Sequence, residues 1–206
     1  MLHVLRFGAR PIPDHVLRGM FAARKEVFID LLHWDVPVIA DAFEVDQFDD
    51  EHAQYLVLTD CDGRHLGSAR LLPTLRPHIL DGLYPELCDE DPPRAADIFE
   101  VTRFCLDRRL RAPARRAVRD TLVMALVDHA LANGIAGYSA IAESAWLQQI
   151  LAFGWHCRPL GAMRTVAGKT LGAVQIDIGP DTPGLLARAG LRALLDPHSA
   201  HVRAAA

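Results

Sequence analysis

Apolar residues recur with two different periods along the first third of the chain. From Asp14 to about Leu32 they recur at helical spacing, and Pro13-Asp14 is a typical start signal for a helix. Period-two patterns over 53–59 and 65–72 predict two strands, and the Asp62-Gly63 dipeptide between them is typical of a hairpin turn. The chain therefore begins with a helix followed by an antiparallel strand pair.

Two long segments lack a regular period. Residues 33–52 are acidic and irregular, but Trp34, Phe43 and Phe48 favour an ordered loop over a disordered one. Residues 73–97 are rich in Pro, Asp and Glu and are expected to form a meandering connection. Long unpatterned loops inside compact domains are usually functional or disordered, which makes the first segment a candidate for function.

The second half of the chain is predicted to alternate between strands and helices. A buried strand is expected over 98–106, and the helix that follows ends at Gly134, a typical helix C-cap. The later elements are a helix, a strand, a helix, a strand and a short helix, over 115–133, 136–142, 144–153, 172–178 and 183–195. A helix, antiparallel strands and then a βαβαβ series predict an α/β sandwich with three layers.

Composition is typical of one globular domain over 1–206. Half of the 206 residues are hydrophobic, yet no apolar run reaches the ~18 residues of a membrane helix, and the N-terminus does not read as a signal peptide. The four cysteines lie far apart without a CxxC pair, which favours reduced thiols and a cytoplasmic location. The ten histidines form no ligand pair of the HExxH kind, so we expect no metal.

Basic residues are concentrated in one place on an acidic chain. The formal net charge is −4, which argues against general nucleic-acid binding. From Arg103 to Arg119, however, seven arginines accompany a single acid, Asp107. Such a patch is typical of contact with one anionic partner, although a solvated loop and helix face would look the same.

Three arginines occupy positions at which the periodic pattern predicts apolar side chains. Arg24 continues the apolar stripe of the first helix, while Arg70 and Arg103 lie within predicted strands. A buried guanidinium needs partners, because removing one partner of a buried pair costs about 3–5 kcal/mol. The acidic loop supplies candidates in Glu44, Asp46 and Asp49, so we expect an ion-pair network lining one cleft. The alternative is a network that only fixes the first helix to the sheet.

Glu100 and Arg103 interrupt the apolar strand over 98–106. Regular alternation places Glu100 and Phe104 on one face and Arg103 on the other. The two charged side chains share a face only if a β-bulge breaks the alternation, and bulges are frequent near active sites.

Four sequence blocks resemble the acyl-homoserine lactone synthases, the autoinducer synthase family of bacterial quorum sensing. The blocks are ARKEVFIDLLHW, EVDQFDD, GSARLLPT and FEVTRF, and they span about residues 20–106. Beyond them the chain resembles the family only in general layout. The positions that match the near-invariant residues of the family are Arg24, Phe28, Trp34, Glu44, Asp46, Asp49, Arg70, Glu100 and Arg103.

The resemblance implies a GNAT-like α/β fold with a mixed, mostly antiparallel sheet and a V-shaped cleft. It implies S-adenosylmethionine and an acyl thioester as substrates, with no prosthetic cofactor, and an N-acyl-L-homoserine lactone, 5′-methylthioadenosine and the free thiol carrier as products. Within the domain, 1–52 would hold the first helix and the S-adenosylmethionine-binding loop, and 53–110 the central strands. Residues 111–195 would form the acyl-pocket half, and 196–206 a frayed tail.

The chemistry of that reaction suggests roles for the matched residues. Glu100 is the first candidate for general base, and Arg103 or Arg24 could grip the substrate carboxylate in a bidentate manner. Backbone N–H groups beside a bulge near Phe104 could stabilise the oxyanion. Glu44 is expected to brace the loop. The residues expected to bind S-adenosylmethionine are Arg24, Phe28, Trp34, Asp46, Asp49, Arg70 and Phe104.

The remaining candidates concern the acyl donor and the acyl chain. RRLRAPARR has no glycine, which disfavours a phosphate-binding loop for coenzyme A and favours acyl carrier protein as the donor. Its docking candidates are Arg108, Arg109, Arg111, Arg115 and Arg116. The acyl pocket is expected to include Met124, Ala140, Leu147, Ile150 and Leu151. In several members of the family that the chain resembles, a Thr or Ser near position 140 accompanies 3-oxo-acyl substrates. By this resemblance Ala140 favours a chain without a 3-oxo group, and Ser139 leaves that open.

Two rival functions are considered. A GNAT-type N-acetyltransferase using acetyl-CoA would explain the fold but not the constellation of Arg24, Trp34, Asp46 and Asp49. A degenerate relative that binds acyl carrier protein without turnover would not need an intact Glu100. The Glu100→Gln variant separates that binder from an enzyme.

Overall fold

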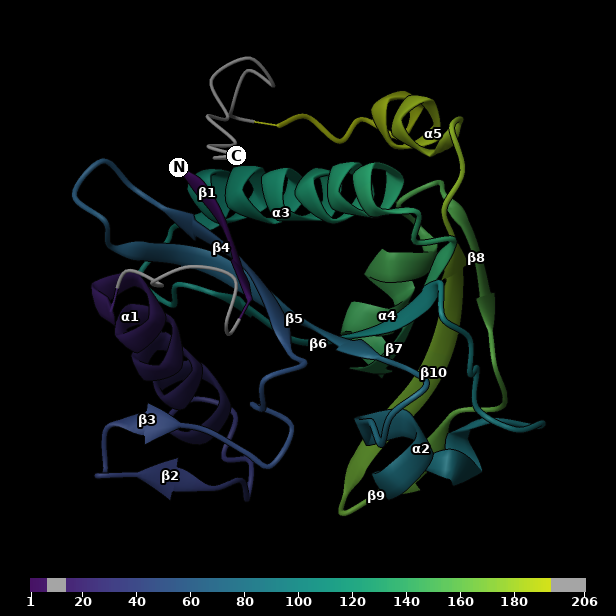
Figure 1. The fold of residues 1–206 in the computed structure, drawn as a ribbon, viewed down its shortest axis with the longest axis horizontal. Helices are drawn as coiled ribbons and strands as arrows, with labels where there is room; N and C mark the ends of the chain where they lie inside the picture. Colours follow the sequence, from purple (N-terminus) through teal and green to yellow (C-terminus); the bar gives the residue numbers. More distant parts are fainter. Residues whose placement is uncertain (7–13, 194–206) are drawn as a thin grey trace. The chain divides into compact units, whose positions relative to one another are not determined.

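The computed structural model describes residues 1–6 and 14–193, which form two compact units. Unit 1 contains 1–6, 14–70, 103–125 and 192–193; unit 2 contains 71–102 and 126–191. Strands β5 (His65–Pro73) and β6 (Ile98–Leu106) and helix α3 (Ala112–Asn133) contribute residues to both units. Figure 1 shows the elements along the chain.

Unit 1 is a sheet with a helix on each face. Strand β1 (Leu2–Arg6) pairs antiparallel with β4 (Gln54–Thr59), and β5 and β6 follow in the sheet order. Helix α1 (Asp14–Arg24) packs on one face, where the Cys105 thiol donates to the Ala23 carbonyl at 3.6 Å. The first part of α3 packs on the other face, against Gly67, and Figure 1 shows α1 and α3 on opposite sides of the strands.

The predicted first helix ends in a wider turn. Helix α1 continues directly into η1 (Lys25–Ile29), a π-helix, and the helical hydrogen bonding reaches the amides of Asp30 and Leu32. π-Helical turns are rare and are frequently found at functional sites. Phe28, one of the residues matched to the family, lies in this turn and is buried.

The acidic segment is more regular than its sequence indicated. It contains a two-stranded hairpin of β2 (Val38–Ile39) and β3 (Phe43–Glu44), closed by the hydrogen bond from the Ala42 amide to the Ile39 carbonyl. The two turn residues, Ala40 and Asp41, have φ of 53° and 52°. That conformation suits a tight hairpin but usually takes Asn-Gly, so the usual sequence signal for the turn is missing.

Unit 2 is built around strand β7 (Gly137–Glu143). It runs parallel to β6, with Ile98 opposite Gly137, and antiparallel to β10 (Lys169–Asp177). The other edge of β10 pairs with β8 (His156–Pro159) and β9 (Arg164–Val166). A helix connecting two parallel strands is the βαβ unit expected from the sequence, and here α3 is that helix.

Helices cover both faces of the sheet in unit 2. The Tyr138 hydroxyl donates to the Leu126 carbonyl of α3, and Leu147 of α4 (Ser144–Leu151) packs over Gly172, which lies opposite Ala142. On the other face, α2 (Ile79–Leu83) and η2 (Pro85–Leu87) bury Leu80 and Leu87 against Ala173. Helix α5 (Thr182–Arg188) completes the unit.

The structure corrects several of the predicted elements. Strands β1, β8 and β9 were not predicted, because each is short and leaves most of its side chains exposed or half-buried. The connection over 73–97 contains α2 and η2, which are too short for a periodic signal. Pro13 and the tail over 196–206 lie outside the described residues, and α5 ends at Arg188 rather than near 195. Across the described part of the chain, no helix combines the length and apolar character needed to span a membrane.

A largely buried histidine at the start of β5 makes the stability of the fold depend on pH. The His65 Nε2 atom lies 2.9 Å from the Ser68 hydroxyl, and burial lowers the pKa of His65 to about 4. The unfolded chain therefore binds a proton between the ordinary histidine pKa of 6.5 and about pH 4, where the folded ring does not. Stability must fall as the pH falls through this window.

We expect the free energy of unfolding to drop by roughly 2–3 kcal/mol between pH 7 and about pH 4 because of His65. Urea unfolding of the wild type and of His65→Gln at both pH values measures it, with His52→Gln at the surface as the control. The His65→Gln variant should show a smaller drop than the other two proteins. Equal drops in all three would show that His65 is not the titrating group.

Candidate active site

Three arginines and three carboxylates form a buried ion-pair network in unit 1. They come from α1, from the acidic segment, from β5 and from β6, so four separate parts of the chain meet in it. The side chains are between 0% and 9% exposed. The network that the sequence predicted is therefore present. Its members are Arg24, Arg70, Arg103, Glu44, Asp46 and Asp49.

Arg24 uses every nitrogen of its guanidinium within the protein. Nε donates to Glu44 Oε2 at 2.5 Å, and Nη1 and Nη2 donate to the two oxygens of Asp49 at 2.8 and 2.9 Å. Burial alone would lower the pKa of Arg24, but its bonds to the two carboxylates raise it above the ordinary value. This arrangement braces α1 against the acidic segment and keeps the Arg24 side chain almost completely buried.

Asp49 is the most heavily bonded of the carboxylates. Besides Arg24 it pairs with Arg70 at 2.9 Å, and it accepts hydrogen bonds from the Asp46 amide and the Tyr55 hydroxyl, each at 2.9 Å. Burial would raise the pKa of Asp49, but these partners hold it well below the ordinary range. Tyr55 is fully buried and was missed by the sequence analysis, because a tyrosine in an apolar strand gives no charge signal.

Arg103 has a backbone conformation that no ordinary strand residue adopts. Its φ is 50° in the middle of the nine-residue strand β6, which is the break in regular geometry that a bulge requires. The guanidinium donates to Glu44 Oε1 from Nε at 3.1 Å and from Nη2 at 3.0 Å, and Nη2 also donates to Asp46 Oδ2 at 2.7 Å. Whether Glu100 and Arg103 share a face stays a prediction.

Two aromatic rings stack beside Arg103. The Phe28 and Trp34 ring centroids are 4.7 Å apart with an interplanar angle of 27°. The Arg103 guanidinium carbon lies 5.6 Å from the centroid of Phe28 and 5.8 Å from that of Trp34, within cation–π range. Trp34 is half-buried, so the aromatic pair lies at the edge of the network rather than inside it.

Glu100 lies in unit 2 and is fully buried. Its carboxylate accepts hydrogen bonds from the amides of Ile79, to Oε2 at 2.8 Å, and Leu80, to Oε1 at 3.0 Å. These are the first amides of α2, so Glu100 caps a helix that begins 21 residues earlier in the chain. The sequence suggests a catalytic role for Glu100 but carries no sign of this structural one.

Two polar atoms near Glu100 are buried without a hydrogen-bond partner in the described part of the chain. Ser139 is the residue directly opposite Glu100 on β7, and its Oγ is one of them. His78 precedes the two capping amides; its Nδ1 donates to the Arg76 carbonyl at 2.9 Å, which leaves Nε2 as the other unpaired atom. Buried polar atoms of this kind usually hold a water or a ligand group.

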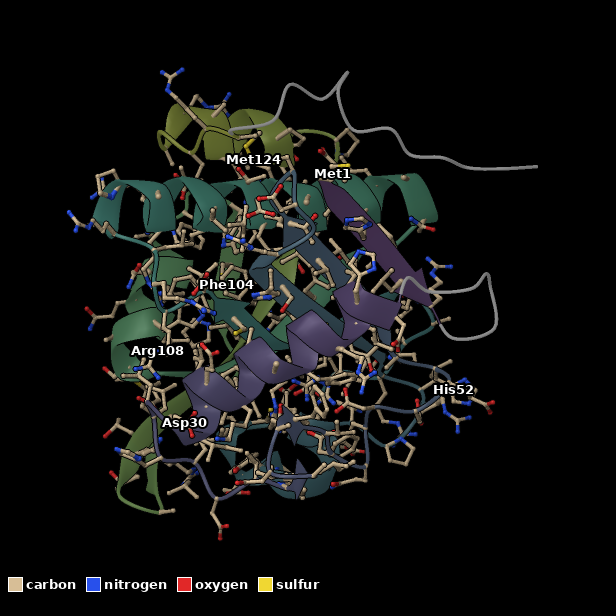
Figure 2. All side chains as sticks on the ribbon, turned by 90° about the vertical axis from the view of Figure 1, so that its left-hand side faces the viewer. Met1, Asp30, His52, Phe104, Arg108 and Met124 are labelled. Atoms are coloured by element: carbon tan, nitrogen blue, oxygen red, sulfur yellow. The ribbon has the colours of Figure 1, made fainter. Side chains whose placement is uncertain are left out.

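The basic loop between β6 and α3 is exposed. We call the side chains Arg108, Arg109, Arg111, Arg115 and Arg116 the arginine surface; all five residues are exposed. Arg109 pairs with Asp107 at 3.0 Å and with Glu26 at 3.3 Å. Figure 2 labels Arg108 and Asp30 towards the left of the view, with Phe104 nearer its centre.

The predicted acyl-pocket residues are divided between the units. Ala140, Leu147 and Ile150 are buried in unit 2, whereas Leu151 is 38% exposed at the end of α4. Met124 belongs to unit 1. A Cβ at Gly172 would lie 2.6 Å from the Leu147 side chain, so the absence of a side chain there allows α4 to approach β10 closely. A pocket lined by these residues stays a prediction.

The order of strands and helices is that of the GNAT acyltransferase fold. A solved structure of a putative N-acetyltransferase from Lactobacillus plantarum matches with a TM-score of 0.59, covering 86% of this chain and 99% of that one. The two sequences are 14% identical, so this likeness shows the fold alone. The predicted class, an α/β fold with a mixed and mostly antiparallel sheet, is confirmed.

The chain belongs to the autoinducer synthase family. The family model "Autoinducer synthase" matches residues 12–182. The isovaleryl-homoserine lactone synthase of Bradyrhizobium diazoefficiens is 31% identical over 191 residues, covering 90% of this chain and 84% of that protein. An acyl-homoserine-lactone synthase of Ralstonia solanacearum is 29% identical and covers 85% of this chain and 88% of that protein. The chain is thus an enzyme of the acyl-homoserine-lactone synthase type.

A solved relative is known with two bound small molecules. The coenzyme A-dependent acyl-homoserine lactone synthase BjaI, with S-adenosylmethionine and isopentyl-CoA, matches with a TM-score of 0.84 at 30% identity. The match covers 95% of this chain and 92% of that one. A second structure of BjaI contains 5′-methylthioadenosine, abbreviated MTA in its description.

Proposed function

We propose that this enzyme transfers an acyl group from a thioester to the amine of S-adenosylmethionine and closes the product to an N-acyl-L-homoserine lactone. The reaction releases 5′-methylthioadenosine and the free thiol carrier. The observation that carries the proposal is the buried network of three arginines and three carboxylates, built from the residues that match the family, in a chain that the family model covers. In this role the enzyme would synthesise a quorum-sensing signal in the cytoplasm.

The exposure and bonding of the guanidinium groups indicate which arginine would hold the substrate carboxylate. Arg24 is 1% exposed and each of its three guanidinium nitrogens is bonded to a carboxylate, so we assign it to bracing. Arg103 is 9% exposed, and its Nε and Nη2 are bonded, whereas no described residue takes its Nη1. We therefore assign the carboxylate of S-adenosylmethionine to Arg103, with the sulfonium beside Phe28 and Trp34, whose ring faces attract cations.

Glu100 is proposed to accept the proton of the attacking amine through a water. Its two oxygens accept the amide hydrogen bonds of Ile79 and Leu80, and a carboxylate oxygen has more than one acceptor site. The unpaired Ser139 Oγ and His78 Nε2 atoms are candidates to hold that water. Backbone amides at the Arg103 bulge would stabilise the oxyanion of the thioester. Glu100 would then both cap α2 and act as the base.

The acyl donor is proposed to dock on the arginine surface. Five exposed arginines suit an acidic carrier protein, which the sequence favours. Similarity to BjaI supports coenzyme A instead, whose phosphates would also suit arginines. A panel of acyl groups, each supplied on both carriers with purified protein and S-adenosylmethionine, tests the reaction and identifies the donor. Release of 5′-methylthioadenosine that depends on the donor is the expected result; no release with any donor would reject the proposal.

Docking on the arginine surface predicts a salt-sensitive reaction. With acyl carrier protein as the donor, the double change Arg115→Glu, Arg116→Glu should raise KM about tenfold or more at low ionic strength, and added salt should shrink the difference. The matched control is Arg158→Glu, an exposed arginine of unit 2. If the KM for the acyl donor changes neither with the charge reversal nor with the salt concentration, docking at this surface is excluded.

A further inference from the structure

Arg103 has a backbone conformation, with positive φ, that is unfavourable for residues other than glycine. For an L-residue with a Cβ atom, φ near +50° brings that atom close to the next carbonyl oxygen, and this conformation is mainly adopted by glycine and, less readily, by asparagine. Four other non-glycine residues in the described chain have positive φ, and all four lie outside helices and strands. Arg103 is the only one of the five within a strand, and the surrounding structure must hold it there.

The side chain of Arg103 is anchored by hydrogen bonds. Three hydrogen bonds tie the guanidinium to Glu44 and Asp46, at 3.1, 3.0 and 2.7 Å. Each of these carboxylates is itself held by another buried arginine, Glu44 by Arg24 at 2.5 Å and Asp46 by Arg70 at 2.6 Å. The anchor is therefore rigid, and it lies entirely within unit 1.

We propose that Glu44 and Asp46 are positioning residues that act through the backbone of Arg103. By holding its guanidinium they keep φ positive, and positive φ turns the peptide groups on either side of Arg103 away from their directions in a regular strand. Those groups include the amides of Arg103 and Phe104, which we assigned to the oxyanion. This inference rests on the proposed function, and it separates a backbone role of Arg103 from the role of its guanidinium.

A series of substitutions at Arg103 tests the backbone role. The variants Arg103→Gly, Arg103→Asn, Arg103→Ala and Arg103→Val all lose the guanidinium, and in all of them Glu44 and Asp46 keep their other arginine. They differ in how well they tolerate positive φ. We expect kcat/KM for lactone formation to fall in the order Gly, Asn, Ala, Val, with Gly about tenfold above Ala. A role of the guanidinium alone predicts no advantage for Gly.

The midpoint of thermal unfolding provides a readout independent of catalysis. It should follow the same order, with Arg103→Gly above Arg103→Ala. The matched control is Gln54, a half-buried residue of strand β4 in the same unit that pairs with Arg6. At this ordinary strand position alanine should be preferred over glycine, so the thermal midpoint of Gln54→Ala should be at least as high as that of Gln54→Gly.

The outcomes separate the inference from the function it rests on. If Arg103→Ala equals or exceeds Arg103→Gly in thermal midpoint, the side chain is not holding a strained backbone and the inference is overturned. If the midpoints follow the predicted order but kcat/KM does not, the positioning role is overturned. If the wild type forms no lactone, the proposed function fails and the positioning role fails with it, whatever the midpoints show.

Discussion

Replacing Glu100 by Gln should lower kcat for lactone formation by about 10²–10⁴-fold, the usual contribution of a general base. The amide keeps the size of the carboxylate but cannot take up a proton. Steady-state kinetics with saturating acyl donor and S-adenosylmethionine measures the loss. The same change should also destabilise the protein by about 1–3 kcal/mol, because an amide NH₂ would then face one of the N–H donors of Ile79 and Leu80.

A matched variant separates the two roles of Glu100. Ile79→Pro removes one amide donor and keeps the carboxylate. Proline is tolerated at the first position of a helix, and His78 before it already has the extended conformation that a following proline requires, with φ −138° and ψ 174°. We expect Ile79→Pro to lose stability but keep kcat within about tenfold of the wild type, unlike a loss of the base. If Glu100→Gln behaves like Ile79→Pro in both measurements, Glu100 is only a cap.

Replacing Arg24 by Met should reduce the free energy of unfolding by about 3–5 kcal/mol, because the buried carboxylates of Glu44 and Asp49 each lose one of their two arginine partners. Urea unfolding at pH 7 measures the loss. The pKa of Asp49 is far below its ordinary range, so that carboxyl stays charged at this pH and down to the acid region. A rise in KM for S-adenosylmethionine should accompany the loss, since the acidic segment is braced by the same pairs.

The control for Arg24 lies on the same helix. Arg18 pairs with Asp14 at 3.3 Å, but the two side chains are 64% and 79% exposed. Arg18→Ala should therefore change stability by less than about 1 kcal/mol. Adding Glu44→Gln to Arg24→Met should recover part of the loss, because it removes one of the charges left behind. If Arg24→Met lowered the free energy of unfolding no more than Arg18→Ala does, the buried network would not be contributing to stability as proposed.

The misplaced charges in the sequence predicted the ion-pair network well. Arg24, Arg70 and Arg103 stood out because each replaced an apolar residue in a periodic pattern, and burial then required partners from the one acidic segment nearby. The pairing within the network could not be predicted. Glu44, Asp46 and Asp49 all lie within six residues, and which guanidinium each one reaches depends on how the acidic segment folds, a feature that the sequence does not reveal.

Features made by distant contacts escaped the sequence. Helix α2 is five residues long and is capped by Glu100 from another strand, so neither periodicity nor a local cap residue marks it. The β2–β3 turn uses Ala40 and Asp41 in a conformation that usually requires Asn-Gly. The strand over 98–106, by contrast, has the predicted bounds, because its apolar run is long and β-branched and aromatic residues dominate it.

The most direct test of the central claim is a product balance with purified protein. The enzyme is incubated with S-adenosylmethionine and the best donor of the panel until the reaction stops. Mass spectrometry then quantifies 5′-methylthioadenosine, the lactone and the free thiol. The proposed reaction predicts equal amounts of all three, with none formed when either substrate is omitted. Free thiol released while S-adenosylmethionine is left intact would show hydrolysis of the thioester and would contradict it. An acylated amine without a lactone would also contradict it and would favour an ordinary N-acyltransferase.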